Sequence, residues 1–305
     1  MMASRASVDS FGTADANIIR VKPRRQPGLW VIAVVLLVLL GLLGYSVATD
    51  GAYAWPTYRR HILDREFGRA ALVTLELTGV ATVIAIVLGV ALASMRASAN
   101  VVLRAVSWAY LWLFRSTPVY LQLVLWGLFT QVYGHVGLGV PGGHRVSSLD
   151  LTNVVTTFVA ACIGLGLNAA AYQAEVFRTG FASVPSGQRE AAVLLGMPPG
   201  LVRRRVVWPQ ASRVIVPATL DRIATTVKVS ALVVAVPFAG DLYGRSLKTA
   251  ALAQREVPLV LAAATWYLLI VSCLLVIRWL VARALDRAPK RPEPAAAIRT
   301  TEAGS

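Results

Sequence analysis

Charged residues are scarce in this sequence. They make up 15% of its 305 residues, whereas hydrophobic residues make up 56%, and the mean hydropathy is +0.63. This balance excludes a water-soluble globular fold for most of the chain. The formal charge of +15 would suit a nucleic-acid-binding surface. The arginines mostly flank apolar runs, however, which is typical of membrane loops, so we expect no nucleic-acid partner.

Cysteine and histidine are also rare. Cys162 and Cys273 both lie inside apolar segments, which favours small buried side chains over a disulfide or a metal site. His61, His135 and His144 lie in expected loops, without cysteines or carboxylates at ligand spacing. We therefore expect no metal, no cofactor and no catalytic residue, and the chain is not predicted to be an enzyme.

The sequence has only four lysines, Lys22, Lys228, Lys248 and Lys290, and none of them follows a glycine. A P-loop needs a lysine directly after a glycine to reach the phosphates of a nucleotide. A P-loop is thereby excluded from this chain. If ATP drives its function, another subunit must hydrolyse it.

Long apolar runs dominate the sequence instead. About 20 helical residues cross a hydrocarbon core of roughly 30 Å. Runs near that length lie at 29–48, 70–93, 118–133, 153–174, 214–236 and 259–280. The sequence thus predicts an all-α membrane protein of about six transmembrane helices. For the first run, a cleavable signal peptide is the competing interpretation, because Ser46-Val47-Ala48 resembles a cleavage site. Residues 101–114 are expected to form a short helix at the membrane surface.

The distribution of Lys and Arg predicts the orientation of the chain. With a cytoplasmic N-terminus, the cytoplasmic segments carry 20 of the 30 basic residues and the external segments carry 8. Both termini are then cytoplasmic, and so is the long connection 182–212. The polar stretches 1–28 and 286–305 are predicted to be disordered cytoplasmic tails.

The connection 182–212 is unusually long and has the pattern of a folded segment. Pro185 can begin a helix, and Gly196 is placed to end it in a left-handed cap. Pro198-Pro199 then begins a second short helix through Leu201 to Val207, which Pro209 is expected to stop. Two interpretations of this unit remain open: a projection that binds another protein, or a hairpin on the membrane surface without a partner.

The same connection resembles the EAA signature of ABC importer permeases. The matching residues are Glu190-Ala191-Ala192, then after three residues Gly196, and after nine more Val206-Val207-Trp208-Pro209. In that family the loop forms coupling helices, which seat in a groove of the ATPase subunit and transmit its closure to the membrane helices. The resemblance implies ABC ATPase subunits as partners. It also implies an ATPase-coupling loop that contains Glu190, Ala191, Ala192, Gly196 and Pro209.

The flanking sequence resembles one branch of that family, the permeases of polar amino acid importers of the histidine, glutamine, glutamate and arginine class. The matches run from Asn168 to Glu175, and from Phe114 to Pro118 followed by Gln122. The similarity covers about residues 67–285. It implies the five-helix core of a type I ABC importer, to which the helix at 29–48 is an addition.

The resemblance further implies the partners and location of the chain. One five-helix core makes half of a pathway, so a second permease copy, identical or paralogous, is expected. An extracytoplasmic solute-binding protein and an amino acid substrate are implied as well, in the bacterial cytoplasmic (inner) membrane. The sequence departs from the branch at Asp221-Arg222, where Asn-Glu is usual.

Ionisable residues inside membrane spans are costly and are therefore candidates for function. Asp221, Thr225 and Lys228 are spaced i, i+4 and i+7, which places them on one face of the fifth run. With Glu76 of the second run they form the candidate translocation path, where paired charges would suit a zwitterionic amino acid. The open alternatives are contacts with a partner permease or a neighbouring helix, and snorkelling toward the interface.

These observations predict the transmembrane permease subunit of an ATP-driven importer that moves a polar amino acid. The first alternative is an ABC importer permease for another small solute, because the EAA loop is shared across many importer types. The second is a secondary transporter, which would favour an inverted repeat, and the sequence contains no convincing internal repeat.

Overall fold

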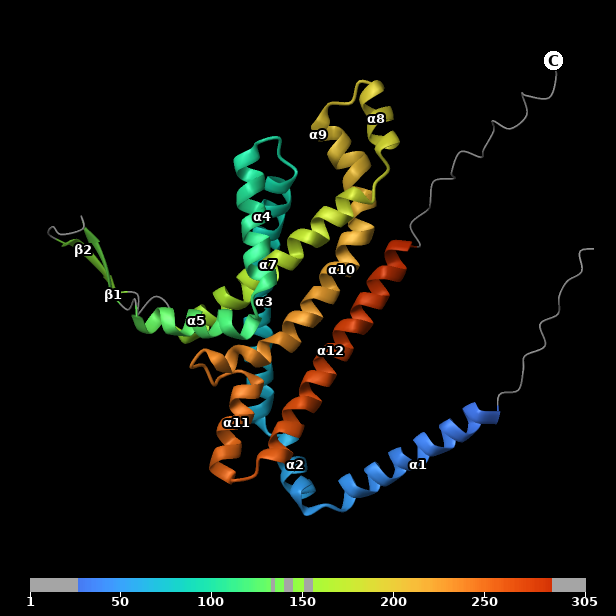
Figure 1. The fold of residues 1–305 in the computed structure, drawn as a ribbon, viewed down its shortest axis with the longest axis vertical. Coiled ribbons are helices and arrows are strands. Elements are labelled where there is room, and N and C mark those ends of the chain that lie inside the picture. The colour runs from blue at the N-terminus through green and yellow to red at the C-terminus, as the bar shows by residue number, and fades with distance from the viewer. Residues whose placement is uncertain (1–26, 133–134, 140–144, 151–155, 287–305) are drawn as a thin grey trace, which may run out of the picture. The chain divides into compact units, whose positions relative to one another are not determined.

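The computed structural model describes residues 27–132, 135–139, 145–150 and 156–286 (Figure 1). The predicted tails 1–28 and 286–305 lie almost entirely outside this part of the chain. The chain divides into two compact units, Met1–Gly51 and Ala52–Ser305. The described part of the first unit is essentially α1 (Pro27–Thr49), which is apolar on every side.

The second unit is helical in its described residues, apart from one hairpin. Its helical elements are η1 (Gly51–Tyr53, which begins at the unit boundary), α2 (Trp55–Ile62), α3 (Arg65–Arg96), α4 (Val101–Ser116), α5 (Val119–Val132), α7 (Thr157–Ala182), α8 (Ser186–Leu194), α9 (Pro199–Val202), η2 (Arg203–Val207), α10 (Trp208–Val229), η3 (Ser230–Ala235), α11 (Leu242–Ala253) and α12 (Glu256–Asp286). The hairpin consists of β1 (His135–Gly139) and β2 (Arg145–Asp150), paired antiparallel from His135 opposite Asp150. It is the one departure from the predicted all-α fold in the described residues.

Helices α3 and α7 pack closely at the centre of the second unit, because α7 offers small residues to α3. A Cβ at Gly166 of α7 would lie only 2.8 Å from the Ile84 side chain of α3. Small residues at such contacts are the usual way for helices to pack inside a membrane. Cys162 is buried in this region as expected, whereas Cys273 of α12 is exposed.

Four described helices are long and apolar enough to cross a membrane by length and composition: Trp30–Thr49, Arg65–Arg96, Thr157–Ala182 and Glu256–Leu285. They coincide with four of the six predicted spans. The other two fall short by this measure for different reasons. The run at 118–133 forms the 14-residue α5, which is too short for a straight crossing. The run at 214–236 lies largely in α10, which carries Asp221, Arg222 and Lys228 and ends at Val229.

Residues 101–114 do not form a separate surface helix. They belong to α4, which runs alongside α3 (Figure 1) and also packs against α7. The Ser107 hydroxyl donates to the Leu92 carbonyl oxygen (2.9 Å), and the Tyr110 hydroxyl donates to that of Leu167 (2.8 Å). Because these polar side chains find partners on α3 and α7, α4 is part of the helical body, and the prediction of a surface helix was wrong.

Candidate functional site

The connection between α7 and α10 folds around Gly196 as predicted. Gly196 follows α8 with a φ of 77°, in the left-handed region. Its N–H donates to the Val193 carbonyl (2.9 Å), and the N–H of Met197 donates to the Ala192 carbonyl (3.1 Å). These two bonds make a Schellman motif, which satisfies carbonyl groups left open at the end of a helix. The left-handed cap is confirmed.

Pro209 does not stop the second helix of this loop. α9 continues into the π-helical turn η2 and then into α10, in which Pro209 is the second residue. A proline breaks an α-helix because it lacks an N–H and its ring meets the carbonyl four residues earlier. In the wider π turn the bonds reach five residues back, as from the Trp208 N–H to the Arg203 carbonyl. The ring is thereby accommodated, and α9, η2 and α10 form one continuous helical segment (Figure 1).

The loop is fixed to the ends of α7 and α10. The Arg189 guanidinium donates to the carbonyl oxygens of Phe181 (2.6 Å) and Val184 (2.9 Å). The Gln210 amide donates to the Gln188 side chain (2.7 Å). Beneath these bonds lies an apolar cluster shared by the loop, α3, α7 and α10: Ala93, Phe177, Val184, Ala192, Val202, Val207, Ala211 and Ile215. We call α8, α9 and η2, held in this way, the arm.

The five residues predicted for the coupling loop all lie on the arm or directly after it. Ala192 is buried in the apolar cluster, whereas Glu190, Ala191, Gly196 and Pro209 are exposed. Ala192 therefore anchors the arm, and the other four are accessible from outside the chain.

Sequence reasoning missed the apolar tip of the arm, which consists of Val193, Leu194 and Leu195. Their exposed fractions are 57%, 87% and 82%. The sequence could have indicated this tip. Three apolar residues directly precede Gly196, which ends the helix, so they lie at its free end. Apolar side chains gathered at such a tip are typical of a protein contact surface.

The candidate translocation residues are only partly brought together. The Asp221 carboxylate forms an ion pair with Arg278 of α12 (2.7 Å), and the Thr225 hydroxyl donates to the Asp221 carbonyl oxygen (2.8 Å). Lys228 and Glu76 are exposed, and neither has a hydrogen-bond or ion-pair partner in the described part of the chain. Asp221 is thus engaged within the chain, whereas Lys228 and Glu76 are accessible.

Tyr172 of α7 carries two cationic neighbours that sequence reasoning did not connect. The guanidinium carbon of Arg115, from the end of α4, lies 5.7 Å from the ring centroid, and that of Arg222, from α10, lies 5.2 Å from it. Both distances are within the range of a cation–π contact. The three residues are far apart in the sequence, and only the packing of α4, α7 and α10 brings them together.

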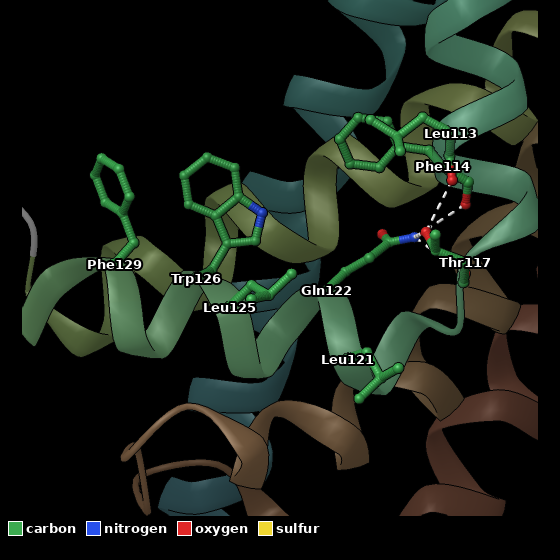
Figure 2. Close-up of a pocket in the computed structure, with 8 residues that line it drawn as sticks. All are labelled: Leu113, Phe114, Thr117, Leu121, Gln122, Leu125, Trp126 and Phe129. Carbon is green, nitrogen blue, oxygen red and sulfur yellow. Dashed lines mark hydrogen bonds between the residues drawn. The ribbon is translucent and has the colours of Figure 1, made fainter. Parts of the chain in front are cut away.

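A pocket of about 390 Å³ lies against α4 and α5 (Figure 2). It is lined by Leu113, Phe114, Thr117, Leu121, Gln122, Leu125, Trp126 and Phe129. The Gln122 amide nitrogen donates to the Phe114 carbonyl (3.1 Å) and to the Thr117 hydroxyl (2.6 Å), and its oxygen accepts from Asn168 (3.0 Å). These bonds fasten the turn between α4 and α5 to α7. The remaining lining is almost entirely apolar, so this pocket is unsuited to a polar solute.

Asp241 precedes α11, outside the four long apolar helices, and its side chain is fully buried. Its Oδ2 accepts from the Tyr243 N–H (3.1 Å) and so caps α11. Burial raises the pKa of this carboxyl to about 6. The next residue, Leu242, donates its N–H to the Thr74 hydroxyl of α3 (2.9 Å), so the capped end is attached to the helical core.

Proteins with similar sequences include several permeases. Residues 85–290 match the family described as the binding-protein-dependent transport system inner membrane component. The arginine transport system permease protein ArgU of Corynebacterium glutamicum is 41% identical over 280 residues, which cover 92% of this chain and 87% of ArgU. The arginine transport system permease protein ArtQ of Bacillus subtilis is 31% identical over 65% of this chain and 83% of its own length.

Solved structures agree with this assignment. An amino acid ABC transporter crystallised with histidines has a chain that is 27% identical, with a TM-score of 0.61, over 72% of this chain and 94% of that one. The MetNI methionine ABC transporter in an inward-facing conformation matches with a TM-score of 0.56 at 23% identity, over 73% of this chain and 97% of that one, which bears on the fold alone. The arm and the apolar helices are thus features of a multi-pass inner-membrane transport subunit, and the chain belongs to the family of binding-protein-dependent transport system inner membrane components.

Proposed function

We propose that this chain is the permease subunit of an ABC importer for a polar amino acid, with arginine as the first candidate solute. The two arginine permeases among its relatives support the solute class, at 41% and 31% identity. The observation that carries the proposal is the arm, a folded helical projection with an exposed apolar tip. A secondary transporter has no need of such a docking element.

The arm is proposed to be the coupling element. An ATPase subunit that covers Glu190 and the apolar tip would remove from water the side chains of Leu194 and Leu195, which are more than 80% exposed here. Fully burying one such side chain contributes roughly 1.5–3 kcal/mol. Because Ala192 and Arg189 tie the arm to α7 and α10, a displacement of α8 would be passed on to both helices. This arrangement favours a protein-binding projection over a hairpin lying on the membrane surface.

The translocation path is proposed to run along the exposed polar face of α10. Lys228 and Thr225 remain its candidates on this helix, and Glu76 of α3 is a third. We assign Asp221 a structural role instead, because its ion pair with Arg278 joins α10 to α12. We expect Lys228→Met to abolish uptake and to leave the complex assembled; wild-type uptake by this variant would remove Lys228 from the path.

The partners follow from the same proposal. ABC ATPase subunits bind the arm, a second permease copy completes the pathway, and an extracytoplasmic binding protein delivers the solute. In this arrangement the arm and both termini face the cytoplasm, in agreement with the distribution of basic residues.

Reconstitution tests the proposal. The permease, its co-purifying ATPase and its binding protein would be placed in liposomes, and ATP-dependent uptake of labelled arginine, histidine, glutamine and glutamate would be measured. ATP-dependent uptake of one of these amino acids supports the proposal. ATP-dependent uptake of a different solute would show that the chain serves an ABC importer with another substrate. Uptake driven by a proton gradient without any ATPase would establish a secondary transporter instead.

A further inference from the structure

Arg115 and Arg222 both contact Tyr172, which places two positive charges near one aromatic ring. Arg115 ends α4, Arg222 lies inside α10, and both guanidinium carbons are within 6 Å of the Tyr172 ring centroid. A contact through the face of a ring satisfies none of the five N–H donors of a guanidinium. Within the residues that the structure describes, neither group has a hydrogen-bond or ion-pair partner. Their donors are therefore available.

The acidic residues nearest to these three along the chain are already paired, and one of them, Glu175, is also attracted by Arg115. Glu175, one helical turn after Tyr172, is bound by Arg178, whose Nε lies 3.0 Å from both carboxylate oxygens. Asp221, the neighbour of Arg222, is paired with Arg278. Two like charges held near one aromatic ring repel each other. The cluster thus carries an excess of positive charge, and an anion placed there would lower its energy.

We propose that Arg115, Tyr172 and Arg222 form the point in the translocation path that holds the carboxylate group of the solute. A planar guanidinium matches a carboxylate through two parallel N–H bonds, which a lysine ammonium does not. Tyr172 holds both guanidinium groups from α7, since each lies over its ring. The α-carboxylate is the one anionic group that every polar amino acid shares, so this site would select amino acids as a class. The inference rests on the proposed function and names residues for it.

Equilibrium binding to the complete transporter in nanodiscs, without binding protein or nucleotide, tests this site. The ligands are arginine and agmatine, and histidine and histamine; the second member of each pair lacks the carboxylate. We expect Arg222→Gln to weaken binding of the amino acid on the order of ten- to hundredfold, the usual effect of removing a hydrogen bond to a charged group. Binding of the decarboxylated partner should stay the same. Arg222→Lys should recover part of the loss, because it restores the charge without the planar geometry.

Matched controls remove an arginine from the same helices. Arg213→Gln lies nine residues earlier on α10, roughly 13 Å along the helix, and Arg104→Gln lies eleven residues before Arg115 on α4, roughly 16 Å. Both controls should bind the amino acid as the wild type does. Basal ATPase activity and the elution volume of the complex check that each variant is folded.

The outcomes separate the site from the proposed function. Unchanged amino acid binding in Arg222→Gln and Arg115→Gln, with a wild type that binds, would overturn the carboxylate site and leave the importer proposal intact. A wild type that neither binds nor transports any amino acid would overturn the proposed function itself. Nanodiscs of phosphatidylcholine, with and without phosphatidylglycerol, identify the source of the anion. If Arg222→Gln has an effect only when the anionic lipid is present, the cluster binds a lipid phosphate and the solute assignment is wrong.

Discussion

Replacing Gly196 with alanine tests the backbone geometry of the arm separately from the chemistry of its side chains. A Cβ added at Gly196 would meet no atom within 4 Å, so the substitution creates no steric clash. The cost is conformational, because φ is 77° and the left-handed region costs a non-glycine residue roughly 1–2 kcal/mol. A loss of about 1 kcal/mol raises the population of the opened loop about fivefold. We expect the amide of Met197, which bonds to Ala192, to exchange about five times faster with deuterium.

The assay is hydrogen–deuterium exchange of the segment 186–202 in the intact complex. Gly187→Ala is the matched control, because Gly187 lies in α8 with no left-handed backbone and with open space around its Cβ position. That change should slow exchange slightly, since alanine favours a helix by roughly 0.5–1 kcal/mol over glycine. Gly196→Asn should lie between alanine and wild type, because asparagine tolerates the left-handed region. Equal exchange in Gly196→Ala and wild type would refute the view that the Schellman motif holds the arm.

Three further substitutions test the contacts around the site. Gly180→Ala should destabilise the complex by roughly 1–3 kcal/mol in thermal unfolding, because the new Cβ would clash with the Ile215 side chain where α7 meets α10. Wild-type stability would show that this contact is looser than described. The folded protein binds the Asp241 proton more tightly than the unfolded chain does. Protonated Asp241 therefore contributes about 3 kcal/mol to the free energy of unfolding. This contribution is full at pH below 4 and is lost as pH rises through about 6. Asp241→Asn should abolish this part of the pH dependence of unfolding, and an unchanged profile would assign it to other groups. The ion pair of Asp221 with Arg278 is half-exposed in the isolated chain, so Asp221→Asn should lower the free energy of unfolding by at most about 1 kcal/mol. The double variant with the two charges exchanged should recover this stability. Additive losses in the two single variants would exclude a direct interaction.

Local patterns predicted the features that depend on neighbouring residues. The cap at Gly196 and the start of α9 at Pro199 follow from backbone preferences that act over a few positions, and the structure has both. The π turn before Pro209 could not be foreseen, because it depends on how α9 and α10 join over the apolar cluster. Sequence patterns report which residues favour a helix, and they carry little information on a change of helical pitch.

The sequence alone could not predict contacts between residues that lie far apart along the chain. Asp221 was placed on the candidate path because it shares a helical face with Thr225 and Lys228, but its partner Arg278 lies 57 positions later on another helix. The meeting of Arg115 and Arg222 at Tyr172 likewise depends on the packing of three helices. Helical periodicity shows which residues share one face, whereas the neighbour of that face is decided by tertiary packing.

We propose that the arm couples an ATPase to the membrane helices. The most direct measurement is binding-protein-stimulated ATP hydrolysis by the permease–ATPase complex in nanodiscs, for wild type, Glu190→Lys and Leu194→Glu. Leu252→Glu on α11 is the control, since Leu252 is 81% exposed and Leu194 is 87% exposed. We expect stimulation to be lost in the two arm variants and retained in Leu252→Glu, with the permease folded in each. Full stimulation in both arm variants would contradict it.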